Sequence, residues 1–559
     1  MQINQTPSWE KLENHLKSDI ADKNICALFL DENRFTNLSF EFDQLFIDFT
    51  KQKITPQTIK LLVDLAESID LQGAIKSLYQ GDKINTTENR AALHTALRLQ
   101  PDTTFEVEGR DINQDIQKEL IGMSALIDKL HLGEWRGFSG KPITDVVNLG
   151  VGGSDLGPML VCEALDEFKL KTKNQVNIHF ASTMDGSQVS TLFGSLNPET
   201  TLFIIVSKSF GTIDTLSNAA SAKAWIMSAC QNEKLVKHQH FIGISTNSKK
   251  MLEWGIHENH QLKLWDWVGG RFSLWSTVGM TIAIKLGMGG FREFLDGANS
   301  LDEHFQTEKL DQNLPALLGL IGVWNANFLN INAQAILPYD ARLKYFPSYL
   351  TQLEMESNGK SITQNGEKIQ YSSCPILWGE VGPNAQHAFY QLLHQGTRQV
   401  ACDFIAPINR FAQGDSEQDR SLQDQHQLTL ANCFAQSRAL MIGSGCEFQD
   451  FDYSDIAPHK YYPGNQASTT ILIEELSPYS LGQLIALYEH KVFVMATVWG
   501  INPFDQWGVE LGKTMAEETL ASLKLKEPLS TFDASTKGLI NKFVNKKNSK
   551  ANNKKSRDL

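Results

Sequence analysis

Apolar positions follow two different periods along the chain, and each period predicts a different kind of element. Within residues 1–120 they recur at helical spacing, most clearly over residues 58–79. Further along, short continuous apolar runs alternate with longer amphipathic stretches, which is typical of βαβ units with a parallel sheet and helices on both faces. The strands expected in a first sheet are residues 143–149, 176–181, 201–206 and 241–245.

A second series of apolar runs predicts a second α/β domain. We place the boundary between the two domains near residues 287–290. Residues 386–394 and 480–498 have the spacing of helices. The strands expected in the second sheet are residues 335–337, 375–378, 399–405 and 469–474.

The composition is that of a globular protein, because 42% of the 559 residues are apolar and 21% are charged. The net charge is −13, but residues 545–559 carry +5 on their side chains, so the remaining chain carries −18. An acidic body gains nothing from a nucleic-acid backbone, so we expect no nucleic-acid partner. The basic tail is too polar to pack; we expect a mobile, solvated end, with a nucleic-acid or targeting role as the alternative.

The sequence also lacks the signals of membrane and secreted proteins. No stretch approaches the ~20 consecutive apolar residues that span a bilayer, and the N-terminus has no secretory signal. The seven cysteines are odd in number, far apart and without a Cys-x-x-Cys pair, which argues against a disulfide framework and a thiolate zinc site. We therefore expect a soluble cytoplasmic protein without a metal or a membrane partner.

The segment from Val146 to Pro158 has the pattern of a strand that runs into glycines and then a helix. Glycines let backbone N–H groups approach an anion, the helix N-terminus adds positive partial charge, and Ser154 can donate a hydroxyl. A dinucleotide-binding loop fits poorly, because the third glycine of its Gly-x-Gly-x-x-Gly pattern falls on Asp155. A tight turn without a ligand is the other alternative to a phosphate site.

The strand expected at 201–206 leads into Ser207-Lys-Ser-Phe-Gly-Thr-Ile-Asp-Thr215. Ligands bind at the carboxyl ends of strands in open parallel sheets, and hydroxyls with one ammonium suit a phosphate dianion. The hydroxyls alone are also consistent with capping of the next helix. We favour a phosphate site, because Lys208 has no role in capping.

Two other local motifs fail in their spacing. Gly508-Val-Glu-Leu-Gly-Lys-Thr514 is one residue too short for a nucleotide-binding P-loop, and no strand precedes it. His257-Glu-Asn-His260 is one residue too short for the zinc-protease pattern, so its histidines would not share a helix face. Neither motif supports a nucleotidase or a metalloenzyme.

Six stretches, collinear from about Thr86 to Lys513, resemble the phosphoglucose isomerase family. They are Thr87-Glu-Asn-Arg-Ala-Ala-Leu-His94, Gly150-Val-Gly-Gly-Ser-Asp-Leu-Gly-Pro158, Asp266-Trp-Val-Gly-Gly-Arg-Phe-Ser-Leu-Trp-Ser276, Met355-Glu-Ser-Asn-Gly-Lys360, Gln386-His-Ala-Phe-Tyr-Gln391 and Phe504-Asp-Gln-Trp-Gly-Val-Glu-Leu-Gly-Lys513.

The resemblance implies two phosphosugar-binding (SIS) domains, each an α-β-α sandwich with a parallel sheet, and a homodimer that needs no cofactor. With the pattern above it predicts a mainly helical region (1–120), a first SIS domain (121–288), a second SIS domain (289–515) and a C-terminal helical arm with the basic tail (516–559).

The activity that the resemblance implies is the interconversion of glucose 6-phosphate and fructose 6-phosphate. This reaction opens the sugar ring and moves a proton between C2 and C1 through a cis-enediol. By the resemblance, Glu356 is the base, and Arg271 stabilises the enediolate oxygen. His387, supplied by the neighbouring subunit, and Lys513 open the ring. The implied substrate contacts are Gly153, Ser154, Ser207, Lys208, Ser209, Thr212, Gln352 and Gln506.

The sequence departs from the family pattern in the second loop, which usually reads Ser-Lys-Thr-Phe-Thr-Thr-x-Glu-Thr. Gly211 removes one hydroxyl, and Asp214 shortens a carboxylate. Phe272 stands where Tyr is common. Two rival functions remain: a catalytically silent phosphosugar sensor, which would need only the phosphate loop, and an NAD-dependent dehydrogenase, which depends on the poorly matching glycine loop.

Overall fold

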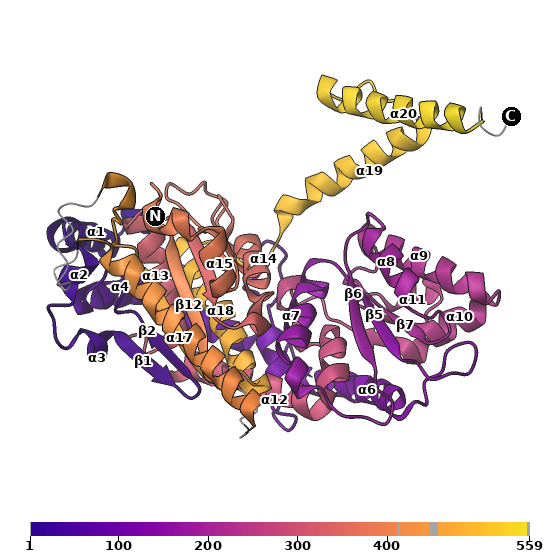
Figure 1. Ribbon diagram of the computed structural model, residues 1–559, viewed down its shortest axis with the longest axis horizontal. Coiled ribbons are helices and arrows are strands. Elements are labelled where there is room, and N and C mark those ends of the chain that lie inside the picture. Colours follow the sequence, from indigo (N-terminus) through magenta and orange to yellow (C-terminus); the bar gives the residue numbers. More distant parts are fainter. Residues whose placement is uncertain (1, 411–413, 415, 446–456, 556–559) are drawn as a thin grey trace. The chain divides into compact units, whose positions relative to one another are not determined.

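The computed structural model describes residues 2–410, 414, 416–445 and 457–555, with residues 548–555 as backbone alone. The chain divides into two compact units, Met1–Phe504 and Asp505–Leu559. The first unit holds two large β-sheets and the helices α1 to α18, and the second holds α19 and α20 (Figure 1).

The first sheet is entirely parallel, as the sequence predicts, with the order β6-β5-β7-β8-β9. Two strands have the predicted bounds, and two begin one or two residues later than predicted. The three residues of the last strand are too few to show a period, and the sequence analysis missed them. The strands are β5 Asp145–Leu149, β6 Asn177–Ala181, β7 Thr201–Val206, β8 Phe241–Ser245 and β9 Gln261–Lys263.

Both faces of this sheet are covered, which is why its strands are apolar at nearly every position. Val146 and Ile204 belong to a large core that includes side chains of α6 (Ile112–Leu132) and α7 (Leu156–Ala164). Val147 and Ile205, their chain neighbours, belong to a separate core on the other face. That second core includes residues of α8 (Ser187–Ser195), α9 (Ile213–Ala229), α10 (Glu233–His240) and α11 (Ser248–Trp254).

The second sheet has the order β1-β2-β13-β12-β10-β11. Its four predicted strands are present and parallel to one another. An N-terminal hairpin adds two antiparallel strands by pairing β2 with β13. The sequence analysis missed this hairpin, because four-residue strands show too few alternations to stand out in a helical region. The strands are β1 Ser39–Phe42, β2 Leu45–Asp48, β10 Ala333–Pro338, β11 Ile376–Gly379, β12 Ala401–Asn409 and β13 Ser468–Glu475.

Helices also cover both faces of the second sheet. Ile336 and Ile405 lie in the large core with α12 (Met280–Thr307), α13 (Leu314–Val323), α14 (Phe346–Asn358) and α18 (Pro478–Trp499). Leu337 and Phe404 face a core with α15 (Gly382–Ala388), α16 (Tyr390–Gln395) and α17 (Glu417–Ile442). In Figure 1, α17 runs along the sheet that contains β12. Both sheets therefore form α-β-α sandwiches and share one core.

Three predicted stretches contain a break in the backbone. The helical pattern of residues 58–79 is divided between α4 (Pro56–Ser68) and α5 (Leu71–Gln80) at Asp70, which is left-handed at φ 55°. The helix predicted at 386–394 is divided into α15 and α16 at Phe389, whose ring packs on Trp378. The boundary proposed near 287–290 lies inside α12, at a kink where Gly287 has φ 73°.

The remaining elements lie mainly in the N-terminal region and in the second unit. They are α1 Pro7–His15, α2 Ile25–Leu28, α3 Arg34–Leu38, the two-stranded sheet β3 Glu106–Val107 with β4 Arg110–Asp111, α19 Glu510–Leu525 and α20 Ala534–Lys555. The backbone of the basic tail is thus helical as far as Lys555, and residues 556–559 lie outside the described part of the chain.

Cys162, Cys230, Cys374, Cys402 and Cys433 are free thiols. Cys26, in contrast, is disulfide-bonded, which the sequence analysis did not predict. Within the described ranges, none of the helices combines the length and the apolar character that crossing a membrane requires.

Candidate active site

Two glycine turns meet in backbone contact at the start of the site. The loop after β5 forms a single 3-10 turn, Gly152–Ser154, and a second 3-10 segment, η7, spans Gly270–Trp275. A Cβ atom on Gly153 would lie only 2.0 Å from the Gly270 carbonyl oxygen. Only glycine permits this approach, which brings Ser154 close to the turn that carries Arg271.

Gln352 links the glycine loop to the predicted base. Its Nε2 atom lies beside Gly152, where an added Cβ would meet it at 2.8 Å. The same Nε2 donates a hydrogen bond of 2.9 Å to Glu356 Oε2, one turn further along α14. Gln352 Oε1 is buried and has no hydrogen-bond partner in the described part of the chain. It is therefore a buried acceptor whose hydrogen-bonding capacity these contacts leave unused.

Arg271 lies against the carboxylate of Glu356. Arg271 Nη1 is 3.6 Å from Glu356 Oε2, and the Arg271 side chain is 1% exposed. Its Nε donates to Ser357 Oγ at 2.6 Å, and its Nη2 donates to the Pro503 carbonyl oxygen. The Glu356 side chain keeps 20% of its surface open. A fixed guanidinium beside an accessible carboxylate can stabilise an oxyanion formed next to the base.

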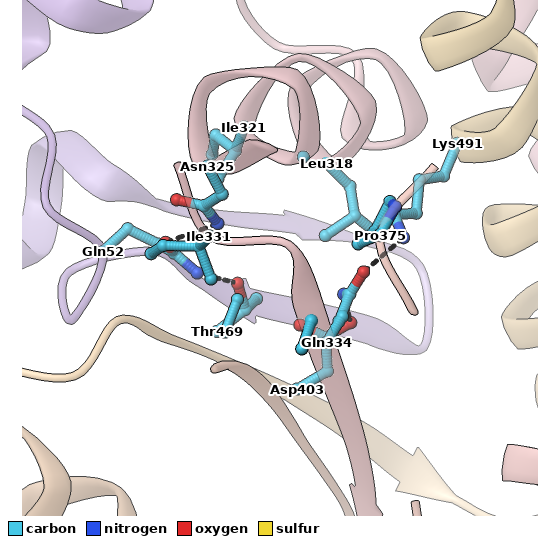
Figure 2. Close-up of a pocket in the computed structure, with 13 residues that line it drawn as sticks. Gln52, Leu318, Ile321, Asn325, Ile331, Gln334, Pro375, Asp403, Thr469 and Lys491 are labelled. Carbon is cyan, nitrogen blue, oxygen red and sulfur yellow. Dashed lines mark hydrogen bonds between the residues drawn. The ribbon is translucent and has the colours of Figure 1, made fainter. Parts of the chain in front are cut away.

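A buried ion pair holds the helix that carries Glu356. Lys491 Nζ of α18 donates to Glu354 Oε2 at 2.7 Å, and both side chains are 1% exposed. Lys491 also donates to Gln334 Oε1, which Figure 2 shows together with Asp403. Burial raises the pKa of Asp403 to about 6, and the nearby Lys491 ammonium opposes this shift. These contacts fix the register of α14 two residues before the base.

The enclosed cavity beside Lys491 is not the substrate site. Its volume is about 10 Å³, and its other end is lined by Gln52, Asn325 and Thr469 (Figure 2). That space is close to the minimum for one water molecule and far below the size of a sugar phosphate. The cavity belongs to the polar core that supports α14.

A second buried network holds η7. Trp275 Nε1 donates to Glu489 Oε1 at 2.9 Å. Arg98, with no exposed surface, pairs with Glu489 Oε2 at 2.8 Å and with Asp302 Oδ2 at 2.9 Å. Burial raises the pKa values of Asp302 and Glu489 to about 7 in each case, although the Arg98 charge opposes it. Because Trp275 and Arg271 share one short turn, this network also positions the Arg271 guanidinium.

The second predicted phosphate loop follows β7. Since β5 and β7 are neighbouring parallel strands, this loop and the Ser154 loop lie at the same edge of the sheet. Ser207 Oγ is 3.0 Å from Thr212 Oγ1, so the two hydroxyls face each other across the turn. Ser207 is buried, whereas Ser209 is exposed. The loop therefore offers hydroxyl groups both inside and at its rim.

Lys208 does not extend freely into this loop. Its Nζ donates to the carbonyl oxygens of Asp266 at 2.7 Å and Val268 at 2.8 Å. Burial, with the Arg90 guanidinium, lowers the pKa of Lys208 to about 8, and Glu88 partly opposes the shift. The Lys208 side chain thus ties the phosphate loop to the segment that leads into η7, a role that the sequence did not reveal.

The segment that ends the first unit is anchored to the same helix. Lys360 Nζ donates to the carbonyl oxygens of Ser357 at 2.7 Å and Asn502 at 2.8 Å. Asn502 Nδ2 donates to Asn85 Oδ1 and Thr87 Oγ1, both at 2.9 Å. The sequence analysis gave these residues no individual role, although three of them lie within the matching motifs. Their place within those motifs was the signal in the sequence that could have pointed to them.

The described contacts bring together Gly153, Arg271, Gln352 and Glu356. They do not connect His387 to this group: His387 is exposed on α15, and no hydrogen bond or ion pair of its ring is found among the described residues. Gln506 and Lys513 belong to the second unit, where Lys513 Nζ pairs with Glu510 at 2.7 Å. The catalytic and substrate-binding roles of all these residues, including the four that lie together, are predictions.

Metal and nucleotide motifs find no support in the geometry. In the part of the chain that the structure describes, no group of three or more His, Cys, Asp or Glu side chains could hold a metal ion. Gly508 lies in a 3-10 turn (Trp507–Val509), and Gly512 lies inside α19. A glycine within a helix cannot form the open loop of a phosphate-binding P-loop.

The comparisons with known proteins agree with one another. The family model described as phosphoglucose isomerase matches residues 48–540. The glucose-6-phosphate isomerase of Hydrogenovibrio crunogenus is 52% identical over 548 residues, which cover 97% of this chain and 100% of that protein. That of Psychrobacter cryohalolentis is 54% identical over 539 residues, which cover 95% and 96%.

A solved structure supports the same relationship. The crystal structure of a glucose-6-phosphate isomerase from Chlamydia trachomatis has a TM-score of 0.83 and 30% sequence identity, and the match covers 97% of this chain and 99% of that one. The family match spans most of the residues that build the two sheets and the site described above. This chain belongs to the phosphoglucose isomerase family.

Proposed function

We propose that this protein interconverts glucose 6-phosphate and fructose 6-phosphate by general acid–base catalysis, with Glu356 as the base. The observation that carries the proposal is the pairing of a partly open carboxylate with a buried guanidinium 3.6 Å away. Family membership supplies the substrate class. A cytoplasmic location follows from the same family, because its substrates are soluble metabolites.

The phosphate group of the substrate binds at the carboxyl edge of the first sheet. Ser154, Ser207, Ser209 and Thr212 donate hydroxyl hydrogen bonds, and the Gly153 backbone allows close approach. From this anchor the carbon chain of the substrate extends toward Gln352 and Glu356. Gln506 adds a further substrate contact, as the family resemblance implies.

Ring opening precedes the isomerisation. In our proposal Lys513 donates to or polarises the ring oxygen, and His387 moves the proton of the anomeric hydroxyl. The C1–O5 bond breaks, the C1 hydroxyl loses its proton, and O5 receives one. The product is the open-chain aldehyde.

Proton transfer then takes place at C2. Glu356 removes the C2 proton, the electron pair left behind forms the C1–C2 double bond, and the carbonyl oxygen becomes an enediol oxygen. The Arg271 guanidinium stabilises the negative charge on that oxygen. The O1 oxyanion takes up a proton, and the C2 hydroxyl gives one up as its oxygen becomes the ketone oxygen of fructose 6-phosphate. Glu356 returns the carbon-bound proton to C1. The atoms balance without another reactant.

We propose that the enzyme acts as a homodimer in which each site receives His387 from the partner subunit. The exposure of His387, and the absence of a bond from its ring to the described site residues, support a role outside its own subunit. Exposed apolar side chains in the second unit, such as Leu511 and Met515, also favour a subunit contact.

The base is tested with Glu356→Gln, which keeps the shape of the side chain and removes its basicity. We expect kcat to fall by a factor of about 100 to 10,000, with substrate binding largely retained. The control is Glu367→Gln, an exposed glutamate in the loop after α14, which should keep wild-type kinetics. Near-normal turnover of the Glu356 variant would refute the assignment. Tight binding without turnover in the wild type would favour the phosphosugar sensor.

The shared site is tested by mixing two inactive variants, Glu356→Gln and His387→Ala. A hybrid dimer contains one site with an intact glutamate from one subunit and an intact histidine from the other. Activity should therefore return after subunit exchange. If both residues acted within one subunit, every site in the mixture would lack one of them, and no activity would return.

A further inference from the structure

Lys250 places a second ammonium group at the rim of the phosphate loop. It is the third residue of α11 and is exposed. Its Nζ lies 3.4 Å from the Ser209 carbonyl oxygen, at the outer limit of a hydrogen bond. Among the described residues no carboxylate lies within 4.0 Å of it, whereas its neighbour Lys249 pairs with Glu253 at that distance. The Lys250 ammonium is therefore available to an incoming anion.

A second cation at the loop after β7 would balance the charge of a bound phosphate group. A sugar phosphate carries a charge of about −1.5 to −2 near neutral pH. The other lysine of the loop, Lys208, donates to two backbone carbonyl oxygens, and its pKa is lowered to about 8 by burial. Above that pH Lys208 loses its charge.

Gly211 leaves the space that the Lys250 ammonium uses. A Cβ at position 211 would lie 3.4 Å from Lys250 Nζ and 3.5 Å from Ser209 Oγ. Both distances are ordinary van der Waals contacts, so a Cβ alone fits beside the ammonium. A threonine, which is usual at this position in the family pattern, adds two further side-chain atoms to that Cβ.

We propose that Lys250 binds the phosphate group of the substrate, and that Gly211 permits this contact. The inference rests on the proposed function for the identity of the substrate, and it adds to that site a residue of the first turn of α11. The long, weak hydrogen bond to the Ser209 carbonyl oxygen holds the ammonium at the loop until the phosphate replaces it. Lys250 acts on phosphate affinity and takes no part in proton transfer.

The test compares Lys250→Gln with Lys249→Gln in the full-length protein. Lys250→Gln should raise KM for fructose 6-phosphate about tenfold, which corresponds to about 1.4 kcal/mol. The effect should fall mainly on KM, because a contact made equally in the ground and transition states leaves kcat unaffected. It should shrink at high ionic strength, since salt screens an exposed charge. Lys249→Gln removes the same charge one residue away. It should change KM less than twofold, because this variant loses only the exposed ion pair with Glu253, and such pairs have small effects.

The coupling to position 211 is tested with Gly211→Thr in both backgrounds. In the wild type the threonine should displace the ammonium and weaken binding of inorganic phosphate, measured by calorimetry. In the Lys250→Gln background it should cause little further loss, because the contact is already absent. Equal effects of Gly211→Thr in the two backgrounds would overturn the proposed link.

The outcomes separate this inference from the proposed function. If the wild type isomerises the sugar but Lys250→Gln and Lys249→Gln have the same KM and the same affinity for inorganic phosphate, Lys250 has no binding role. If the wild type does not isomerise the sugar, the proposed function fails, while calorimetry with inorganic phosphate still decides the role of Lys250.

Discussion

Gly153→Ala is a direct test of whether the site depends on the contact between its two glycine turns. The added methyl group would lie 2.0 Å from the Gly270 carbonyl oxygen and 2.6 Å from the Arg271 backbone nitrogen. Both clashing atoms are backbone, so no side-chain rotation can relieve the overlap. The loop after β5 and the turn that carries Arg271 must move apart.

The size of the displacement follows from the geometry. Real Cβ atoms essentially never approach other atoms closer than 3.0 Å, so the two backbones must separate by at least about 1.0 Å. A misplacement of ~1 Å at a catalytic group costs on the order of 100-fold in rate. Forced overpacking of a close contact costs ~1–3 kcal/mol of folding free energy. Both losses should appear together.

The assay measures kcat/KM with fructose 6-phosphate and the urea midpoint of unfolding. The matched control is Gly270→Ala on the other side of the same contact, where a Cβ would meet nothing within 4 Å. We expect Gly153→Ala to lose about 100-fold in kcat/KM, with a lower urea midpoint. Gly270→Ala should keep the wild-type midpoint.

Wild-type kinetics and a wild-type midpoint in Gly153→Ala would show that the two turns do not need this contact. A loss of stability in both variants would show that general helix or turn propensity causes the effect. Either result would refute the conclusion that close backbone approach positions Arg271.

Two further predictions concern the buried network under η7. Arg98→Met leaves Asp302 and Glu489 without their cation and should cost ~3–5 kcal/mol of unfolding free energy at pH 8, measured by urea denaturation. The cost should be smaller at pH 5, where the two carboxyls can bind protons; an equal cost at both pH values would contradict this explanation. The second prediction is pH dependence: burial raises both carboxyl pKa values to about 7 from the unfolded values of 3.8 and 4.5. The native state therefore binds more protons than the unfolded state in that interval, and stability should fall as pH rises through it. Glu489→Gln should flatten the profile between pH 5 and 7, and an unchanged slope would exclude Glu489 as a source.

The parallel sheets were predictable because each buried strand is a continuous apolar run. β7 and β8 have the predicted bounds, since both faces of these strands are covered and every residue of each strand is buried. The N-terminal hairpin was not predictable in the same way. Its strands become a sheet edge only through pairing with β13, more than 400 residues away, and no local period records that contact.

The motifs identified the candidate site residues but not the partners that their side chains contact. Lys208 was predicted to bind phosphate through its ammonium, yet that ammonium donates to the carbonyl oxygens of Asp266 and Val268. Lys250 lies outside every motif, and its position depends on how α11 packs beside the loop. Local sequence patterns cannot report such contacts, because they depend on the meeting of distant segments.

The surroundings of Glu356 on α14 support the role that we propose for it as the base. Taken alone, Glu356 has the surroundings of an ordinary surface charge. Three other polar residues of the same helix end are buried: Glu354 pairs with Lys491, Ser357 accepts from Arg271, and Asn358 donates to the Val492 carbonyl oxygen. Each contact joins α14 to another part of the fold, so Glu356 is the one member of this group whose carboxylate keeps an open side. The burial of its neighbours holds this accessible carboxylate 3.6 Å from the Arg271 guanidinium, which is the arrangement that the proposed proton transfer between adjacent carbons requires.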